Sequence, residues 1–220
     1  MQSNTGMSEN LQHYRKSYDK GALRKNQALS DPLDQFTKWF DELKALDVDF
    51  EINAMHCITL DEAGYPVSRV VLLKGYDQDG FQFFTNYNSQ KAQNIEKHPL
   101  VSLSFFWPNM ERQVHIRGKA QKMSAAASDA YFSVRPRGSQ IGAHVSEQSA
   151  VIESREFLET RLKALEELYA NKEIPRPAHW GGYLIQPHEY EFWQGRPNRL
   201  HDRLRYTQVD GQWKIERLAP

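Results

Sequence analysis

The stretch NAMHCITLDEAGYPVSRVVLLKGYDQDGFQFFTN, residues 53–86, places apolar segments between short polar ones that contain Asp and Gly. Apolar segments of this length, bounded by turn residues, are typical of antiparallel strands joined by hairpins. The turn residues stand at 61–64 (Asp-Glu-Ala-Gly) and at 77–80 (Asp-Gln-Asp-Gly). The stretch therefore predicts three successive strands, at 53–60, 66–74 and 80–85.

Strand patterns continue beyond this stretch, and helices interrupt them. A short helix is expected at about 89–97, with Ser89 as its N-cap, and Asp210-Gly211 supplies the turn of a last hairpin. Many strands with tight turns and few helices favour a barrel or a sandwich, so we expect a mainly β fold with peripheral helices. The further strands are expected at 100–106, 112–123, 181–186, 189–194, 202–207 and 212–218.

Three longer helices complete the predicted secondary structure. The first begins clearly, because Asp31 can cap it and Pro32 suits its first turn. Its apolar residues recur at helical spacing and are Leu33, Phe36, Phe40, Leu43 and Leu46. The other two helices are expected at about 124–132 and 153–170. The last carries an apolar stripe that we expect to face the core, made of Phe157, Leu158, Leu162, Leu165 and Tyr169.

The composition bounds the class of protein. The 220 residues carry 28 Lys+Arg and 28 Asp+Glu, and this zero net charge gives no general attraction to nucleic acid or to an anionic membrane. The single cysteine, Cys57, is expected to be a buried hydrophobe rather than a nucleophile, and its being alone fits a reducing compartment. Met1–Asn10 is polar, and no apolar run approaches the roughly 20 residues of a membrane span. We expect a cytoplasmic protein with one domain at 31–220, preceded by an arm at 1–30.

Cationic residues occur in four segments where an anion would favour them. In the first, RVVLLK at 69–74, Arg69 and Lys74 flank an apolar strand, on which cations are costly to bury without an anion. Strand-end charges that reach water are the alternative. In the second, a strand ends at 84–86 (Phe-Thr-Asn) and a helix begins at 89–91 (Ser-Gln-Lys). The free N–H groups of a helix N-terminus suit phosphate, although Ser-capped helices are also common without a ligand.

The third and fourth segments lie later in the chain. Residues 131–142 combine a Tyr, two Arg and a Ser around a helix end, and these donors suit phosphate, with a basic surface loop as the alternative. In the fourth, Arg199, His201 and Arg203 alternate, so they share one face if the segment is extended. Three such groups repel one another unless an anion lies among them; an exposed edge strand is the alternative.

No motif for a competing chemistry is present in the sequence. The patterns GxGxxG, GxxxxGK[ST], HExxH, CxxC and GxSxG are all missing. The histidines show no metal-ligand spacing, so no metal site is expected. The basic residues Arg24, Lys25 and Arg217 are interpreted as solvated surface, with a second anion site as the alternative.

Together the four segments resemble the pyridoxine/pyridoxamine 5′-phosphate oxidase family over nearly the whole chain. The matching motifs are RVVLLK at 69–74, RPRGSQIGA at 135–143, EFWQG at 191–195 and NRLHDR at 198–203. The resemblance implies a split β-barrel and a homodimer with two FMN sites at the subunit interface. It also implies oxidation of pyridoxine 5′-phosphate and pyridoxamine 5′-phosphate to pyridoxal 5′-phosphate, with O₂ reduced to hydrogen peroxide.

The resemblance also implies roles for individual residues. Those implied to bind FMN are Arg69, Val70, Val71, Leu72, Leu73, Lys74, Phe84, Thr85, Gln90, Lys91, Gln113, Gln148, Ser149, Trp193 and Arg203. Those implied to hold the substrate are Arg15, Tyr18, Lys74, Tyr131, Arg135, Ser139, Arg199, Leu200 and His201. Among these, Arg199 and His201 would act in catalysis beside the pyridine ring, and Arg15 and Tyr18 would belong to a lid formed by the arm.

The chain departs from the family pattern at Gln90, and two alternative functions stay open. The family often has Ser-Arg-Lys where this chain has Ser-Gln-Lys, and the uncharged Gln90 is expected to weaken the binding of the FMN phosphate. The alternatives are another split-barrel flavoprotein, such as an FMN-dependent reductase or a haem-handling relative, and a non-catalytic protein that stores FMN or carries pyridoxal 5′-phosphate. Fold alone does not separate these activities. The phosphate-binding pattern at 131–139 favours the oxidase, and the charged segment at 199–203 argues against storage.

Overall fold

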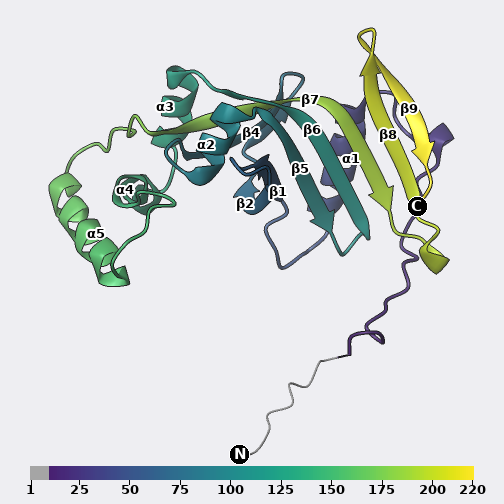
Figure 1. Cartoon of the computed structure of the whole chain (residues 1–220), viewed down its shortest axis with the longest axis horizontal. Coiled ribbons are helices and arrows are strands. Elements are labelled where there is room, and N and C mark those ends of the chain that lie inside the picture. Colours follow the sequence, from purple (N-terminus) through teal and green to yellow (C-terminus); the bar gives the residue numbers. More distant parts are fainter. Residues whose placement is uncertain (1–9) are drawn as a thin grey trace, which may run out of the picture.

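The structure, a computed structural model, describes residues 10–220, so residues 1–9 of the predicted arm lie outside it. Within this range, nine antiparallel strands form one sheet, in the order β2-β1-β5-β6-β7-β4-β3, and β8 and β9 continue from β7. Helices lie at the periphery of the sheet (Figure 1). The strands are β1 (Ala54–Leu60), β2 (Pro66–Leu72), β3 (Gly75–Asp77), β4 (Gly80–Asn86), β5 (Leu100–Trp107), β6 (Arg112–Lys122), β7 (Trp180–Gln194), β8 (Asp202–Val209) and β9 (Gln212–Leu218).

The long strand β7 is where the sheet divides. It pairs with β6 along almost its whole length, while its first half pairs with β4 and its second half with β8. Pro187, which has no N–H to donate, lies between the two halves, and the β6–β7 register shifts beside it, between Arg117 and Gly118. The sheet thereby curls into a half-barrel. The strands predicted at 181–186 and 189–194 are one strand, because β6 bridges the irregularity.

Helix α1 (Pro32–Lys44) supplies the centre of the main core. It begins as predicted, with the Asp31 carboxylate accepting a hydrogen bond from the Leu33 N–H at 2.7 Å. Phe36 is fully buried, and its ring centroid lies 5.0 to 5.9 Å from four aromatic rings of the sheet, those of Tyr76, Phe81, Phe105 and Trp107. Leu46 lies beyond the end of the helix and is exposed, so the predicted apolar stripe ends at Leu43.

A smaller second core lies under the helices that connect β6 to β7. These helices are α3 (Ala125–Ser133), α4 (Arg137–Val145) and α5 (Arg155–Tyr169). Its buried residues are Phe132, Ile141, Ala143, Val145, Ile174 and Trp180. The stripe predicted on α5 is only half-buried against this cluster, and its first member, Phe157, is exposed. Helix α4 was not predicted, because it begins after a Pro and carries two Gly and few apolar residues. The tertiary packing of Ile141 and Val145 stabilises it.

The structure also differs from the prediction at the start of one helix and at the end of one strand. Helix α2 (Gln90–Lys97) follows Ser89, but the Ser89 hydroxyl donates to the Asn86 carbonyl instead of capping the helix. Strand β2 ends at Leu72, and the short strand β3 turns back from Gly75 to pair with β4. Cys57 is fully buried as expected, and burial raises the pKa of its thiol to about 11.

None of the helices between residues 10 and 220 combines the length and the apolar character that crossing a membrane requires.

Candidate functional site

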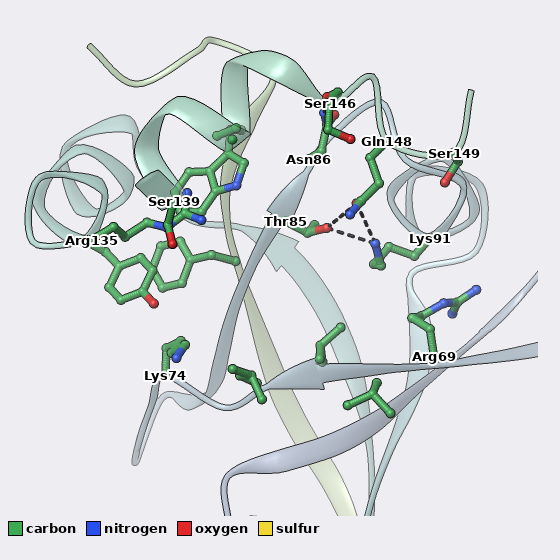
Figure 2. A pocket seen from close by; sticks show the side chains of 18 of the residues that line it. Arg69, Lys74, Thr85, Asn86, Lys91, Arg135, Ser139, Ser146, Gln148 and Ser149 are labelled. Atoms are coloured by element: carbon green, nitrogen blue, oxygen red, sulfur yellow. Dashed lines mark hydrogen bonds between the residues drawn. The ribbon is translucent and has the colours of Figure 1, made fainter. Parts of the chain in front are cut away.

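A pocket of about 1000 Å³ lies between β2, β4, the start of α2 and helices α3 and α4. Figure 2 shows Lys74, Arg135 and Ser139 on one side of it and Arg69, Lys91, Gln148 and Ser149 on the other. The residues predicted for the site that line it are Arg69, Val70, Val71, Leu72, Lys74, Phe84, Thr85, Gln90, Lys91, Tyr131, Arg135, Ser139, Gln148 and Ser149. Four discontinuous segments of the chain therefore meet in one cavity.

Lys91 is the most deeply placed cation of the pocket. It leaves only 8% of its surface exposed, and its ammonium group donates to Gln148 Oε1 at 2.8 Å and to Thr85 Oγ1 at 3.0 Å. Burial, together with the positive charge of Arg69, lowers the pKa of Lys91 from its ordinary value of 10.5 to about 8. The two neutral partners hold the ammonium group in place without neutralising it.

Arg69 and Ser149 complete this side of the pocket. The Arg69 guanidinium donates to the Cys57 carbonyl at 3.0 Å and to Thr59 Oγ1 at 2.7 Å, so this predicted strand-end charge is bound to neutral acceptors. The backbone N–H of Gln90, the first residue of α2, donates to the Ser149 hydroxyl at 3.2 Å. Ser149 thus takes the position at the helix N-terminus that the sequence assigned to Ser89.

On the opposite side, Arg135 has an unsatisfied donor. Its guanidinium lies over the ring of Trp180, 4.4 Å from the centroid, and its buried Nη1 has no hydrogen-bond partner among the described residues. Burial lowers the pKa of Arg135. Because buried donors are nearly always paired in folded proteins, an orphaned guanidinium nitrogen in a cavity indicates that a ligand completes it.

Aromatic stacking orients this side of the pocket. The rings of Phe84 and Tyr131 are stacked with centroids 4.0 Å apart, and the nearly parallel Trp180 ring lies 5.5 Å from Phe84 and 6.2 Å from Tyr131. The stack ties α3 to β4 and β7, which holds Tyr131 and Arg135 at fixed positions beside Ser139 and Lys74.

The pocket carries four cations, Arg69, Lys74, Lys91 and Arg135, and its lining includes no Asp or Glu. Within residues 10–220, none of the four takes part in an ion pair. Partly buried cations without counter-ions repel one another and are poorly solvated, so an anionic ligand is expected to stabilise them. The arrangement suits a ligand, or a pair of ligands, with negative charge at both sides.

The other predicted site residues do not line this pocket, and all of them except Leu73 lie in the arm or near the far end of the sheet. The Trp193 ring lies 4.7 Å from that of His201 and 5.7 Å from that of Tyr18, so the arm packs against the EFWQG and NRLHDR motifs. Gly195 permits this contact, because a Cβ there would lie 2.8 Å from the Tyr18 Cβ. Arg15, in contrast, is exposed, and its side chain donates to the Gln12 carbonyl within the arm itself.

The segment before β8 is not extended, contrary to the prediction. Pro197–Arg199 forms a single 3₁₀ turn, and Asn198 and Arg199 have φ values of 58° and 61°. Arg199 and Leu200 are exposed on this turn, and His201 is half-buried. Arg199 therefore does not share a strand face with Arg203, since the alternation rule applies only to extended backbone.

Gln113, Trp193 and Arg203 lie side by side on β6, β7 and β8, because they are direct partners in the two ladders. Arg203 is already neutralised, since its guanidinium donates to both carboxylate oxygens of Glu191, at 2.8 and 3.0 Å. Leu73, predicted to contact the cofactor, is buried in the main core and is not part of the pocket lining.

Two groups of predicted residues are thus separated on one chain. The first group surrounds the pocket near β2, α3 and α4, and the second lies near the end of β7 and the C-terminus, on the opposite side of the half-barrel in Figure 1. Sequence reasoning missed several pocket residues, among them Asn86, Ser146 and Trp180. Nothing in the sequence indicated that Trp180 lines the pocket, because its position beside Arg135 depends on how β7 packs against α3.

The half-barrel sheet and the cation-lined pocket at its helical edge define a split-barrel protein of the FMN-binding type. The family model described as "Pyridoxamine 5′-phosphate oxidase" matches residues 42–169, and that described as "Pyridoxine 5′-phosphate oxidase C-terminal dimerisation region" matches residues 180–220. This chain belongs to the pyridoxamine 5′-phosphate oxidase family. Both the family and the fold expected from the sequence are confirmed.

Relatives and solved structures agree with this assignment. The pyridoxine/pyridoxamine 5′-phosphate oxidase of Flavobacterium johnsoniae is 55% identical over 95% of this chain and 98% of its own length. That of a Synechocystis species is 49% identical over 96% and 98%. PhzG from Burkholderia lata, solved in complex with tetrahydrophenazine-1-carboxylic acid, is 28% identical, with a TM-score of 0.85 over 93% of this chain and 100% of that one.

Proposed function

We propose that this chain oxidises pyridoxine 5′-phosphate and pyridoxamine 5′-phosphate to pyridoxal 5′-phosphate with FMN as cofactor and O₂ as the final electron acceptor. We further propose that each site is assembled from two protomers. One observation carries the proposal: a pocket with a cationic group on each side and no acidic residue, on a chain of this family. Both FMN and the substrate carry a phosphate, so two anion-binding sides are what the reaction requires.

The side around Lys91 fits the FMN phosphate. Lys91 and Arg69 supply charge, the hydroxyls of Thr85 and Ser149 supply neutral hydrogen-bonding groups, and Gln148 orients the lysine. A phosphate at this position would offset the mutual repulsion of the two cations, which accounts for a buried lysine that no carboxylate neutralises. Gln90 adds a backbone N–H here but no charge.

FMN affinity is expected to fall as the pH rises above about 8. Below this pH, Lys91 is already protonated, so this group contributes no pH dependence. Above it, a growing fraction of the free protein has neutral Lys91, and FMN binding must be accompanied by proton uptake. The dissociation constant is therefore expected to rise by up to about tenfold per pH unit until the pKa of the complex is reached. Quenching of flavin fluorescence at pH 7, 8, 9 and 10 measures it.

The control for this prediction is Lys91→Met, which keeps the length of the side chain but cannot be charged. Its FMN affinity is expected to be about 10- to 100-fold weaker at pH 7, the value of a charge-assisted hydrogen bond, and nearly constant between pH 7 and 9. An equally steep pH dependence in Lys91→Met would show that another group is responsible.

The side around Arg135 fits the substrate phosphate. Arg135 offers the unpaired Nη1, and Lys74, Tyr131 and Ser139 line the same side of the pocket. Binding energy from a phosphate held here can position the rest of the substrate without contact to the reacting carbon. The stacking of Tyr131 on Phe84 keeps this side of the pocket rigid.

Arg135→Ala is expected to raise KM for either substrate by about 10- to 100-fold, because one charged hydrogen-bonding partner of the phosphate is lost. FMN content is expected to remain that of the wild-type protein, since Arg135 lies away from Lys91. Steady-state oxygen consumption and the absorbance of bound flavin measure both quantities. Arg155→Ala, an exposed substitution on α5, is the matched control and should change neither. A normal KM in Arg135→Ala would remove it from the phosphate site.

FMN, when bound, supplies the acceptor for a hydride equivalent from C4′ of the substrate and passes the electrons to O₂. The chain's own groups position the substrate. In the two-protomer proposal, Arg199 and His201 reach the pyridine ring from the partner, because neither residue lines the pocket of its own chain. Arg199 is permanently charged, so it cannot act as a base, and its role in this proposal is electrostatic: it would hold the electron-rich substituents of the pyridine ring in place during the transfer. In the same proposal, His201 donates a hydrogen bond to the ring substituents.

An oxygen-electrode assay of the FMN-loaded protein with each substrate tests the function. Oxygen consumption with either phosphate ester, and anaerobic bleaching of the flavin band by the same compound, are expected. Bleaching by NAD(P)H alone would favour a reductase, and an unchanged spectrum with every donor would favour a storage protein. A protein that stays colourless after incubation with FMN would contradict the proposal at its first step.

A further inference from the structure

The carboxylate of Asp202 lies at the junction of three parts of the chain. It follows His201 directly at the start of β8, and only 17% of its side chain is exposed. Oδ2 accepts the backbone N–H of Leu23 at 3.0 Å, and Oδ1 accepts Arg217 Nη1 at 2.6 Å. The Nε of Arg196 lies 3.5 Å from Oδ2. One side chain thus joins the N-terminal arm, the turn before β8 and the last strand.

Further contacts of the same arginines strengthen this junction. Arg196 Nη1 donates to the Gly21 carbonyl at 2.7 Å, and Arg217 Nη2 donates to the Leu23 carbonyl at 2.9 Å. Arg217 lies at the surface as expected, with 44% of its side chain exposed, but it is also part of an ion-paired network. Because the arm carries Tyr18, which packs on Trp193 and His201, this network sets how the arm lies on the turn.

The turn itself needs such support. Asn198 and Arg199 occupy the left-handed region, which residues other than Gly rarely adopt and which persists only where the surroundings hold it. Within the turn, the backbone N–H of Arg196 donates to His201 Nδ1 at 3.1 Å. This bond requires Nδ1 to be an acceptor, so in the neutral ring the proton is on Nε2, the nitrogen that remains free to donate to a ligand.

We propose that Asp202 is a positioning residue: it holds the Arg196–His201 turn and the arm in the geometry in which Arg199 and His201 act on the substrate. The inference rests on the proposed function. Asp202 touches neither phosphate side of the pocket, so its effect is exerted through the turn and the arm.

Asp202→Asn tests this, because it keeps the size of the side chain but removes the charge and one acceptor oxygen. The limiting rate of anaerobic flavin bleaching is expected to fall about 10- to 100-fold, the effect of misplacing a catalytic group by about an ångström. The half-saturating substrate concentration is expected to change less than threefold, because the phosphate is held elsewhere. FMN affinity and thermal midpoint are expected to match those of Asp210→Asn, the same substitution at an exposed turn between β8 and β9.

The outcomes separate the two proposals. Wild-type protein that does not bleach with either substrate would overturn the proposed function and this role with it. Normal bleaching in Asp202→Asn, or a loss that parallels a loss of FMN affinity and thermal stability, would overturn the positioning role alone. If Asp202→Asn does not fold, Arg196→Gln replaces it: a fall of about threefold or more in the bleaching rate at unchanged FMN affinity supports the role, and an unchanged rate refutes it.

Discussion

Mixed dimers of Arg135→Ala and Arg199→Ala protomers are expected to recover about a quarter of the wild-type activity at low substrate concentration, although the parents retain only about 1–10% (Arg135→Ala) and about 1% or less (Arg199→Ala). Random pairing of equal amounts makes half of the dimers mixed. In each mixed dimer, one of the two sites receives both substitutions and the other receives neither. Half of the sites in half of the dimers are therefore intact.

This expectation follows from where the structure places the two residues. Arg135 lines the pocket, whereas Arg199 lies on the turn at the far end of the half-barrel. A site that needs both must take them from different chains, and a two-fold symmetric dimer makes two such sites. The match of residues 180–220 to a C-terminal dimerisation region is consistent with pairing through the part of the chain that carries Arg199.

Co-expression of two differently tagged protomers, followed by tandem purification, gives mixed dimers in pure form, which are expected to show about half of the wild-type activity. The matched control combines Arg135→Ala with Lys91→Met, two substitutions on the same pocket. In that pair each site of a mixed dimer carries one defect, so no recovery is expected. Absence of recovery with Arg135→Ala and Arg199→Ala would mean that both residues serve one site on the same chain.

Arg199→Ala alone is expected to lower kcat by about 10²- to 10³-fold, the usual loss when one preorganised charged donor is removed from a transition state. FMN affinity is expected to change little, because Arg199 is exposed on the turn and does not line the pocket that contains Lys91. The effect should therefore appear in the limiting rate of flavin bleaching under anaerobic conditions.

Arg199→Lys is the informative companion to this variant. It keeps the positive charge but loses the planar, bidentate guanidinium, so an intermediate rate is expected if charge and geometry both contribute. Turnover at the wild-type rate in purified, FMN-loaded Arg199→Ala would show that the catalytic role assigned to Arg199 is wrong.

Most of the fold could be predicted from local patterns. The hairpin turns at 61–64 and 77–80 and the capped start of α1 are short-range features, because the residues that specify them are neighbours in the chain. The prediction failed where long-range packing decides. Helix α4 is held by the second core, and β7 continues through Pro187 because β6 bridges the irregularity.

The functional site shows the same difference between features that depend on local sequence and features that depend on long-range packing. Residue types and motifs singled out Arg69, Lys74, Lys91 and Arg135, which the structure brings to one pocket, because a cation on an apolar strand or at a helix end favours an anion wherever it lies. The sequence alone did not indicate that Ser149 accepts the first N–H of α2, that Glu191 neutralises Arg203 or that the Arg135 guanidinium lies over the Trp180 ring. Each of these contacts joins residues that are not neighbours in the chain.

The sequence by itself determined the family, the predominance of antiparallel strands and the residues able to bind two phosphates, since these depend on residue types and short spacings. Only the tertiary structure showed that these residues form two separate groups, one around Lys91 and Arg135 and one around Trp193 and His201. The physical reason is that the curl of the sheet along β7 sets the distance between the two groups. That curl arises from pairings between segments that are roughly 60 to 100 residues apart in the chain.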